Sequence, residues 1–235
     1  MLDDRRDSRY YNVTTPSPYT EAGKIFRLAQ LYETVTNRGV SSNRYFLSRS
    51  ENKDNLKAKL AVLNRAKEFV GDGIDLSTLN PILTEIMTNT NNHAGERKGE
   101  LACFISVIEM RDENKMCFCM IDLGVGIYES VYTKGGELLK QGGVAQKIAN
   151  TFFSYGQSEL LASNIPVGVK SSTKLLWRGK GLKEVYYRVQ DGPYVNFDII
   201  TNKARVNLLD ILNVEDDSEH NIDATIYYWE LEGVK

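Results

Sequence analysis

Two apolar runs separated by a short polar turn constrain the fold of this chain more than any other feature. Residues 101–110 (LACFISVIEM) and 115–124 (KMCFCMIDLG) are mostly apolar, and residues 111–114 (RDEN) separate them. Runs of this length joined by so short a turn are typical of a β-hairpin. Because apolar side chains would point to both faces, we expect the hairpin to lie centrally in a covered sheet.

Helical patterns lie on both sides of this hairpin. Apolar residues recur at helical spacing in residues 20–36 and 55–70, and a third helix is expected to contain residues 81–94 (PILTEIMTNTNNHA). After the hairpin we expect a short helix near residues 144–155 and another that begins within residues 177–192.

The remaining strands follow the last of these helices. Residues 194–201 (YVNFDIIT), 204–209 (ARVNLL) and 224–232 (ATIYYWELE) have the composition of strands. Strands and helices do not alternate as β-α-β units along the chain. The pattern therefore predicts an α+β fold, a two-layer sandwich in which helices cover one face of a mostly antiparallel mixed sheet.

The chain divides into an extension and one domain. We expect residues 1–54 to form an N-terminal extension with one helix at 20–36, which either packs on the domain or serves as a dimer or partner element. Residues 55–235 form the domain. Within it, residues 128–177 are a long glycine-, serine- and lysine-bearing connection, and connections of this length are more often functional lids than plain linkers.

Composition and charge restrict the partners and the location. The 235 residues contain 29 basic and 31 acidic side chains, so no broad field is expected to attract nucleic acid or an anionic membrane. No apolar run is long enough for a membrane span and the first residues have no apolar signal-peptide core, so we expect a cytoplasmic protein. Cys103, Cys117 and Cys119 lie in apolar runs without metal-ligand spacing and are expected to be reduced core thiols.

Residues 81–94 combine a core helix with an unusual polar stripe. At 100° per residue, Glu85, Asn89 and Asn92 fall on one side of the helix, and the apolar residues occupy a different arc. A solvated face is the alternative interpretation. That face would favour long charged side chains, whereas asparagine and threonine are weak helix formers, so the stripe indicates a site.

Two glycine-rich segments are candidates for the rest of that site. Asp122 emerges at the end of an apolar strand, and Gly124 and Gly126 behind it would let another group approach the backbone closely. The residues of the second segment surround a helix start whose free N–H groups and basic side chains could hold phosphate; they are Arg178, Gly179, Lys180, Gly181 and Leu182. Alternatively, each segment is an ordinary turn. The P-loop and dinucleotide fingerprints are both absent.

Taken in order, these motifs resemble the GHKL superfamily of ATP-binding domains, which includes gyrase, a heat-shock chaperone, histidine kinases and mismatch-repair proteins. The resemblance covers residues 55–232 and rests on E-x-x-x-N in a helix, D-x-G-x-G after a strand, a long lid, G-x-G-L at a helix start and a threonine on the last strand. The resemblance implies the Bergerat-type ATP-binding fold. The compact chain with its N-terminal segment also resembles small stand-alone bacterial ATP-binding proteins that work beside regulatory partners.

The resemblance also implies roles for individual residues. Asn89 would ligate a Mg²⁺ ion that bridges the ATP phosphates, and Glu85 would polarise an attacking water or hydroxyl group. Asp122 would accept a hydrogen bond from the adenine amino group, with Gly124 and Gly126 giving the base room. Thr225 would join the adenine contact. The glycine box at 178–182 would meet the phosphates.

Two functions remain open at this point. The first is an ATP-using enzyme, an ATPase or a serine-directed protein kinase, favoured by Glu85. The second is a non-catalytic, ATP-gated switch whose lid exposes or hides a partner surface. His93 ends the polar helix and His220 lies in an acidic loop, so no phosphoacceptor helix is visible and we expect no autonomous histidine kinase. The sequence therefore predicts a regulatory partner protein or a homodimer.

Overall fold

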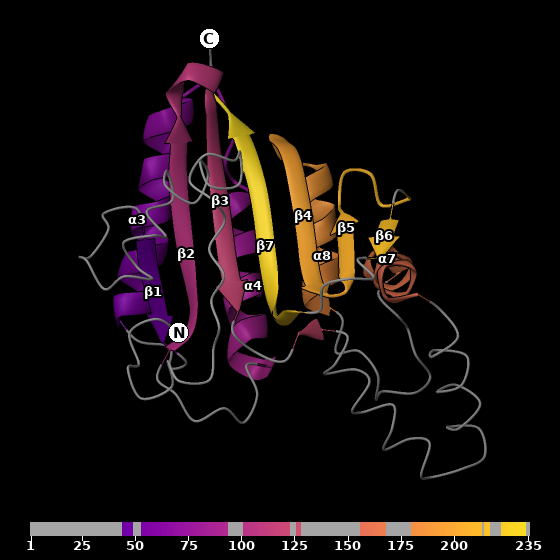
Figure 1. The fold of residues 1–235 in the computed structure, drawn as a ribbon. Coiled ribbons are helices and arrows are strands. Elements are labelled where there is room, and N and C mark those ends of the chain that lie inside the picture. Colours follow the sequence, from indigo (N-terminus) through magenta and orange to yellow (C-terminus); the bar gives the residue numbers. More distant parts are fainter. Residues whose placement is uncertain are drawn as a thin grey trace, which may run out of the picture.

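The computed structural model describes residues 44–48, 53–93, 101–122, 126–127, 156–167, 180–212, 214–216 and 222–233. These residues have an α+β architecture in which helices cover an antiparallel sheet (Figure 1). The strands are β1 (Arg44–Ser48), β2 (Leu101–Met110), β3 (Lys115–Asp122), β4 (Tyr194–Asn202), β5 (Ala204–Asn207), β6 (Val214–Asp216) and β7 (Ile222–Glu232). The helices are α3 (Lys53–Val70), α4 (Leu79–His93), α7 (Gln157–Val167) and α8 (Lys180–Gln190).

The sheet has the order β1-β2-β3-β7-β4-β5-β6. Every pair among the described strands is antiparallel, so the mixed sheet expected from the sequence does not occur in this part of the chain. The predicted hairpin is confirmed. Its turn is a short 3-10 segment closed by Asn114, whose left-handed φ of 53° suits asparagine. β3 lies between β2 and β7, as the apolar character of both its faces predicts.

The sequence predicts neither of the two edge strands. β1 falls in the expected N-terminal extension, yet it pairs with β2 and places Phe46 opposite Phe104. β6 is three residues long and pairs with β5. Short edge strands are held by the open backbone groups of a neighbouring strand and carry little alternating pattern of their own, which is why they escape a sequence pattern.

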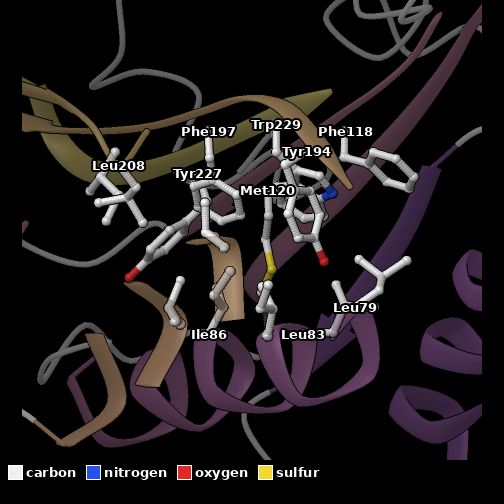
Figure 2. Close-up of a cluster of buried hydrophobic side chains, with 14 of the residues drawn as sticks. Leu79, Leu83, Ile86, Phe118, Met120, Tyr194, Phe197, Leu208, Tyr227 and Trp229 are labelled. Atoms are coloured by element: carbon white, nitrogen blue, oxygen red, sulfur yellow. The ribbon is translucent and has the colours of Figure 1, made fainter. Parts of the chain in front are cut away.

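The main hydrophobic core fills the space between the sheet and the helices. Leu83 and Ile86 of α4 are 2% and 0% exposed, and they point toward the inner face of the sheet (Figure 2). On that face Trp229 of β7 stacks between Phe118 of β3 and Phe197 of β4, with ring centroids 5.0 and 5.5 Å away. One aromatic ring from each of three adjacent strands therefore belongs to the same core as the buried side chains of α4.

Helix α7 lies inside the segment predicted as a lid, and it is a packed element. Leu161 and Ile165 belong to the main core, and the Arg205 backbone N–H donates a 3.1 Å hydrogen bond to the Ser158 hydroxyl. The lid expected over residues 128–177 stays a prediction, and α7 is a packed helix within that segment. Small residues and Pro166 weaken the helical pattern there, so the sequence does not predict this helix. The helices expected at 20–36 and 144–155 lie outside the described residues.

The outer face of the sheet carries a smaller apolar cluster. Ile108 and Cys117 form it, with Met110 and Tyr228 packed against them. Burial raises the pKa of the Cys117 thiol, and it raises that of Cys119 to about 12. Both groups are therefore protonated at neutral pH. In the described part of the chain, no helix combines the length and the apolar character needed to cross a membrane.

Candidate functional site

Helix α4 carries the predicted polar stripe beside its buried arc. Glu85 and Asn89 are half-buried, and they lie one helical turn apart. Two neighbouring threonines are satisfied within the helix, because Thr84 and Thr88 each donate a 2.8 Å hydrogen bond to the carbonyl four residues earlier. The side chain of Asn92 lies outside the described part. The carboxylate and the amide at positions 85 and 89 are thus the functional groups that this stripe presents.

The start of helix α8 approaches these two side chains closely. Gly181 is buried, and a Cβ atom placed on it would lie 2.8 Å from Asn89 Oδ1 and 3.1 Å from Glu85 Oε2. Any side chain at position 181 would therefore displace Asn89 from its present position. The first N–H groups of a helix have no intrahelical partner and form its positive end, and α8 has no acidic residue in its first turn. An amide oxygen, a carboxylate and a helix start suited to anions therefore meet at one place.

A second polar group runs across the three central strands. Asp122 of β3 lies directly opposite Thr225 of β7, which lies directly opposite Thr201 of β4. The three side chains are 7%, 3% and 1% exposed, and strand alternation puts them on the helix-covered face of the sheet. Neighbouring side chains in such a row are about 5 Å apart at Cβ. A buried carboxylate thus stands beside the hydroxyl group of Thr225, and the hydroxyl group of Thr201 follows on the next strand.

The backbone after β3 is fastened to this row. Gly126 adopts a φ of 85°, and its Cα lies against the side chain of Asn202. The backbone N–H of Ile127 donates a 2.8 Å hydrogen bond to Thr201 Oγ1. A side chain at position 126 would be strained by the left-handed backbone and would also collide with Asn202. The second glycine of D-x-G-x-G is therefore required by the local geometry.

Both polar groups lie toward the same end of the sheet. β3 and β4 end there and β7 begins there, and α4 extends to the same end beneath them (Figure 1). Asn89 and Asp122 are 33 positions apart in the sequence, so the fold brings them to the same end of the sheet. A ligand with hydrogen-bonding groups at one end and negative charge at the other would match these two polar groups.

The other predicted site residues have mixed positions. Lys180 is the first residue of α8, and the side chain of Leu182 belongs to the main core, so it supports the helix start from within. Gly124, Arg178 and Gly179 lie outside the described residues. The sequence reasoning missed Thr201 and Asn202. The signal that could have found them is a pair of polar residues ending an otherwise apolar strand.

No group of three or more histidine, cysteine, aspartate or glutamate side chains suited to a metal ion occurs among the residues that the structure describes. Asn89 could hold a divalent ion together with a bound ligand. An amide oxygen is a hard ligand of the kind that Mg²⁺ accepts, and Mg²⁺ commonly binds through one or two protein groups together with phosphate oxygens and waters.

No family model, no curated protein and no solved structure matches this chain.

Proposed function

We propose that this chain binds Mg²⁺-ATP in a Bergerat-type site of the GHKL class and uses it either for hydrolysis or to phosphorylate a partner protein. The observation that carries the proposal is the approach of Gly181 to Asn89 and Glu85. It joins a helix start suited to phosphate with an amide oxygen suited to Mg²⁺ and a carboxylate suited to a nucleophile.

The row of Asp122 and Thr225 favours adenine recognition at one end of the proposed site. Adenine offers an amino donor next to a ring nitrogen acceptor. A carboxylate can accept from the amino group, and a hydroxyl group can donate to the ring or to a bridging water. Because both side chains are almost fully buried, these hydrogen bonds would form away from bulk water, where polar contacts discriminate most strongly.

The phosphate end is supported by the start of α8. With no side chain at Gly181, a polyphosphate could approach the first N–H groups of the helix. Asn89 would hold Mg²⁺ through its side-chain oxygen, and the ion when bound would neutralise charge on the phosphate oxygens. Arg178, Gly179 and Lys180 complete this end in the proposal.

Glu85 is the proposed general base. It lies one turn before Asn89 and reaches the same glycine, so its carboxylate would stand beside the terminal phosphate. There it would accept a proton from an attacking water or from a hydroxyl group of a partner protein, a role usually worth about 10²- to 10⁴-fold in rate.

A second candidate function is a non-catalytic, ATP-gated interaction switch. It is favoured by the packing of α7 against α8, because nucleotide bound at the start of α8 would act on an element that leads directly into the adjoining segments of the predicted lid. A regulatory protein or a second copy of the chain would bind or dissociate in response to that change.

Binding and turnover by the purified chain test the proposal. We expect calorimetry to show binding of Mg²⁺-ATP by the wild type, with Asp122→Asn at least ~10-fold weaker, since hydrogen bonds to charged groups are worth about 1.5–3 kcal/mol. Asp198→Asn is the matched control. Asp198 is also a buried aspartate in a central strand, but it is paired with Arg205 on the other face of the sheet. That variant should lose stability and keep its affinity.

The role of Glu85 is tested by turnover. Glu85→Gln should bind Mg²⁺-ATP but lose hydrolysis or phosphoryl transfer by ~10²-fold or more, while Glu68→Gln, an exposed glutamate on α3, should behave as the wild type. Turnover that survives in Glu85→Gln would show that the base is another group. Binding without any turnover by the wild type would favour the switch. A wild type that fails to bind Mg²⁺-ATP at millimolar concentration refutes both functions. We expect the protein to be cytoplasmic, because ATP and Mg²⁺ are abundant in the cytoplasm.

A further inference from the structure

Thr201 is the most enclosed member of the polar row, and the resemblance assigns it no role. Its side chain is 1% exposed. Its Oγ1 atom lies 2.8 Å from the backbone N of Ile127, 3.2 Å from Thr225 Oγ1 and 3.2 Å from the carbonyl oxygen of Ala224. The single hydroxyl group therefore connects three chain segments, the loop after β3 and the strands β4 and β7.

Counting protons shows what this hydroxyl can do. A threonine hydroxyl has one proton and two lone pairs. One lone pair of Thr201 receives the N–H of Ile127. When Thr201 donates its proton to the carbonyl of Ala224 or to Asn202 Oδ1, 3.4 Å away, its second lone pair can accept the proton of Thr225, so Thr225 presents lone pairs to its surroundings. When Thr201 donates to Thr225 instead, the proton of Thr225 becomes available to another group. Thr201 thus sets the hydrogen-bonding polarity of Thr225.

Asn202 strengthens the same connection from the next position. It adopts a φ of 53°, which asparagine tolerates better than most residues, and its side chain is 5% exposed. That side chain lies against the Cα of Gly126 and occupies the space that a side chain at 126 would need. The loop after Asp122 is therefore held at two adjacent points, by a hydrogen bond to Ile127 and by a steric contact at Gly126.

We propose that Thr201, supported by Asn202, is a positioning residue that gives the proposed nucleotide site its preference for adenine. It holds the loop behind Asp122 in place and orients the hydroxyl of Thr225, and it contacts the base through neither of its own hydrogen-bonding sites. This inference rests on the proposed nucleotide binding.

The preference for ATP over GTP measures this role directly. A loss of packing that loosens the whole domain would weaken both nucleotides alike, whereas misplacing Asp122 and Thr225 would weaken mainly the nucleotide whose base they recognise. In Thr201→Val the shape is kept, but Ile127 loses its acceptor and Thr225 loses its partner. We expect ATP affinity to fall ~5- to 50-fold and the ratio of GTP to ATP dissociation constants to fall ~5-fold or more.

Three further variants make the result specific. Thr201→Ser keeps the hydroxyl and should restore ATP affinity and the nucleotide ratio to within ~3-fold of the wild type. Thr78→Val is the matched control, because Thr78 is also a buried threonine, but its hydroxyl bonds to Tyr194 at the opposite end of β4. It should lose stability and leave the ratio unchanged. Asn202→Gly suits the left-handed backbone and removes the contact with Gly126 together with the 3.4 Å hydrogen bond that Thr201 Oγ1 donates to Asn202 Oδ1, so it should fold and should also lower the ratio.

The outcomes separate this inference from the proposed function. If the wild type binds neither nucleotide, both ideas are wrong. If the wild type binds ATP and Thr201→Val keeps the same ratio of dissociation constants, the positioning role is refuted and the proposed function stands. The same conclusion follows if Thr201→Ser behaves like Thr201→Val. Should Thr201→Val fail to fold, Asn202→Gly decides the question, and an unchanged ratio in that variant overturns the inference.

Discussion

Replacing Gly181 with alanine tests the geometry of the candidate site most sharply, because it should separate stability from binding. Gly181 lies in the first turn of α8, and alanine is favoured over glycine in a helix by up to about 1 kcal/mol. The free energy of unfolding of Gly181→Ala should therefore stay within about 1 kcal/mol of the wild-type value or rise slightly. A purely structural view of this glycine predicts no further effect.

The new methyl group would compete with Asn89 for space. It would lie 2.8 Å from Asn89 Oδ1, 2.9 Å from Nδ2 and 3.1 Å from Glu85 Oε2, closer than ordinary contacts allow. The Asn89 side chain can rotate away from the methyl group in the free protein, but it would have to return to its original conformation to bind the ligand. Holding a side chain about 30° from its preferred rotamer costs about 0.5–1.5 kcal/mol. Mg²⁺-ATP should thus bind ~2- to 12-fold more weakly, and the loss should be larger with Mg²⁺ than without it.

Thermal unfolding and calorimetry with and without Mg²⁺ provide the two measurements. Gly71→Ala is the matched control, since Gly71 ends α3 with a φ of 73° and has open space around the position of a Cβ. Alanine there should cost about 1–2 kcal/mol of stability through the left-handed backbone and leave nucleotide affinity unchanged. Unaltered affinity in a folded Gly181→Ala protein would refute the idea that Asn89 and α8 together form a ligand site.

Three other predictions concern the fold. Ile86→Ala removes a fully buried side chain from the core and should lower the free energy of unfolding by about 2–5 kcal/mol in urea titrations. A hydrogen bond from Arg65 keeps the pKa of Glu109 below its ordinary value, so this carboxylate stabilises the fold above its unfolded-state pKa and loses that effect as the pH falls. Glu109→Gln should therefore flatten the acid side of the stability profile, by about 1 kcal/mol or less, and an unchanged profile would contradict the pairing. Because burial raises the thiol pKa values of Cys117 and Cys119, neither should react with iodoacetamide at pH 8 until the protein unfolds, as site-resolved mass spectrometry would show.

The sequence predicts the central elements of this fold well, for physical reasons. The hairpin of β2 and β3 is apolar on both faces, and the apolar residues of α4 recur at helical spacing. The local sequence pattern therefore predicts each of these elements. The edge strands β1 and β6 and the helix α7 are different. They are held by backbone groups and surfaces that other segments supply, such as the contact of Ser158 with Arg205, and a local pattern does not contain that information.

The residues of the candidate site also differ in how well the sequence predicts them. Glu85, Asn89 and Asp122 are polar residues where an apolar pattern is interrupted, which makes them visible in the sequence. Thr201 and Asn202 are visible only weakly, because their importance comes from register. Register puts Thr201 opposite Thr225, and the backbone turn at Asn202 brings its side chain to Gly126. Both relations join segments that are far apart in the chain.

The order of the strands has a consequence for how this protein is made. β7, the final strand of the described chain, lies in the middle of the sheet, and it joins β3 through contacts such as that between Lys115 and Glu230, which are separated by 115 positions. During synthesis, the half of the sheet that contains β1, β2 and β3 and the half that contains β4, β5 and β6 must therefore wait for the strand that unites them. Proteins dominated by such distant contacts fold slowly and expose open strand edges meanwhile. A nascent chain stalled before Ile222 would have two separate sheets with unpaired edges, the form in which we expect it to be most prone to aggregation and most dependent on chaperones.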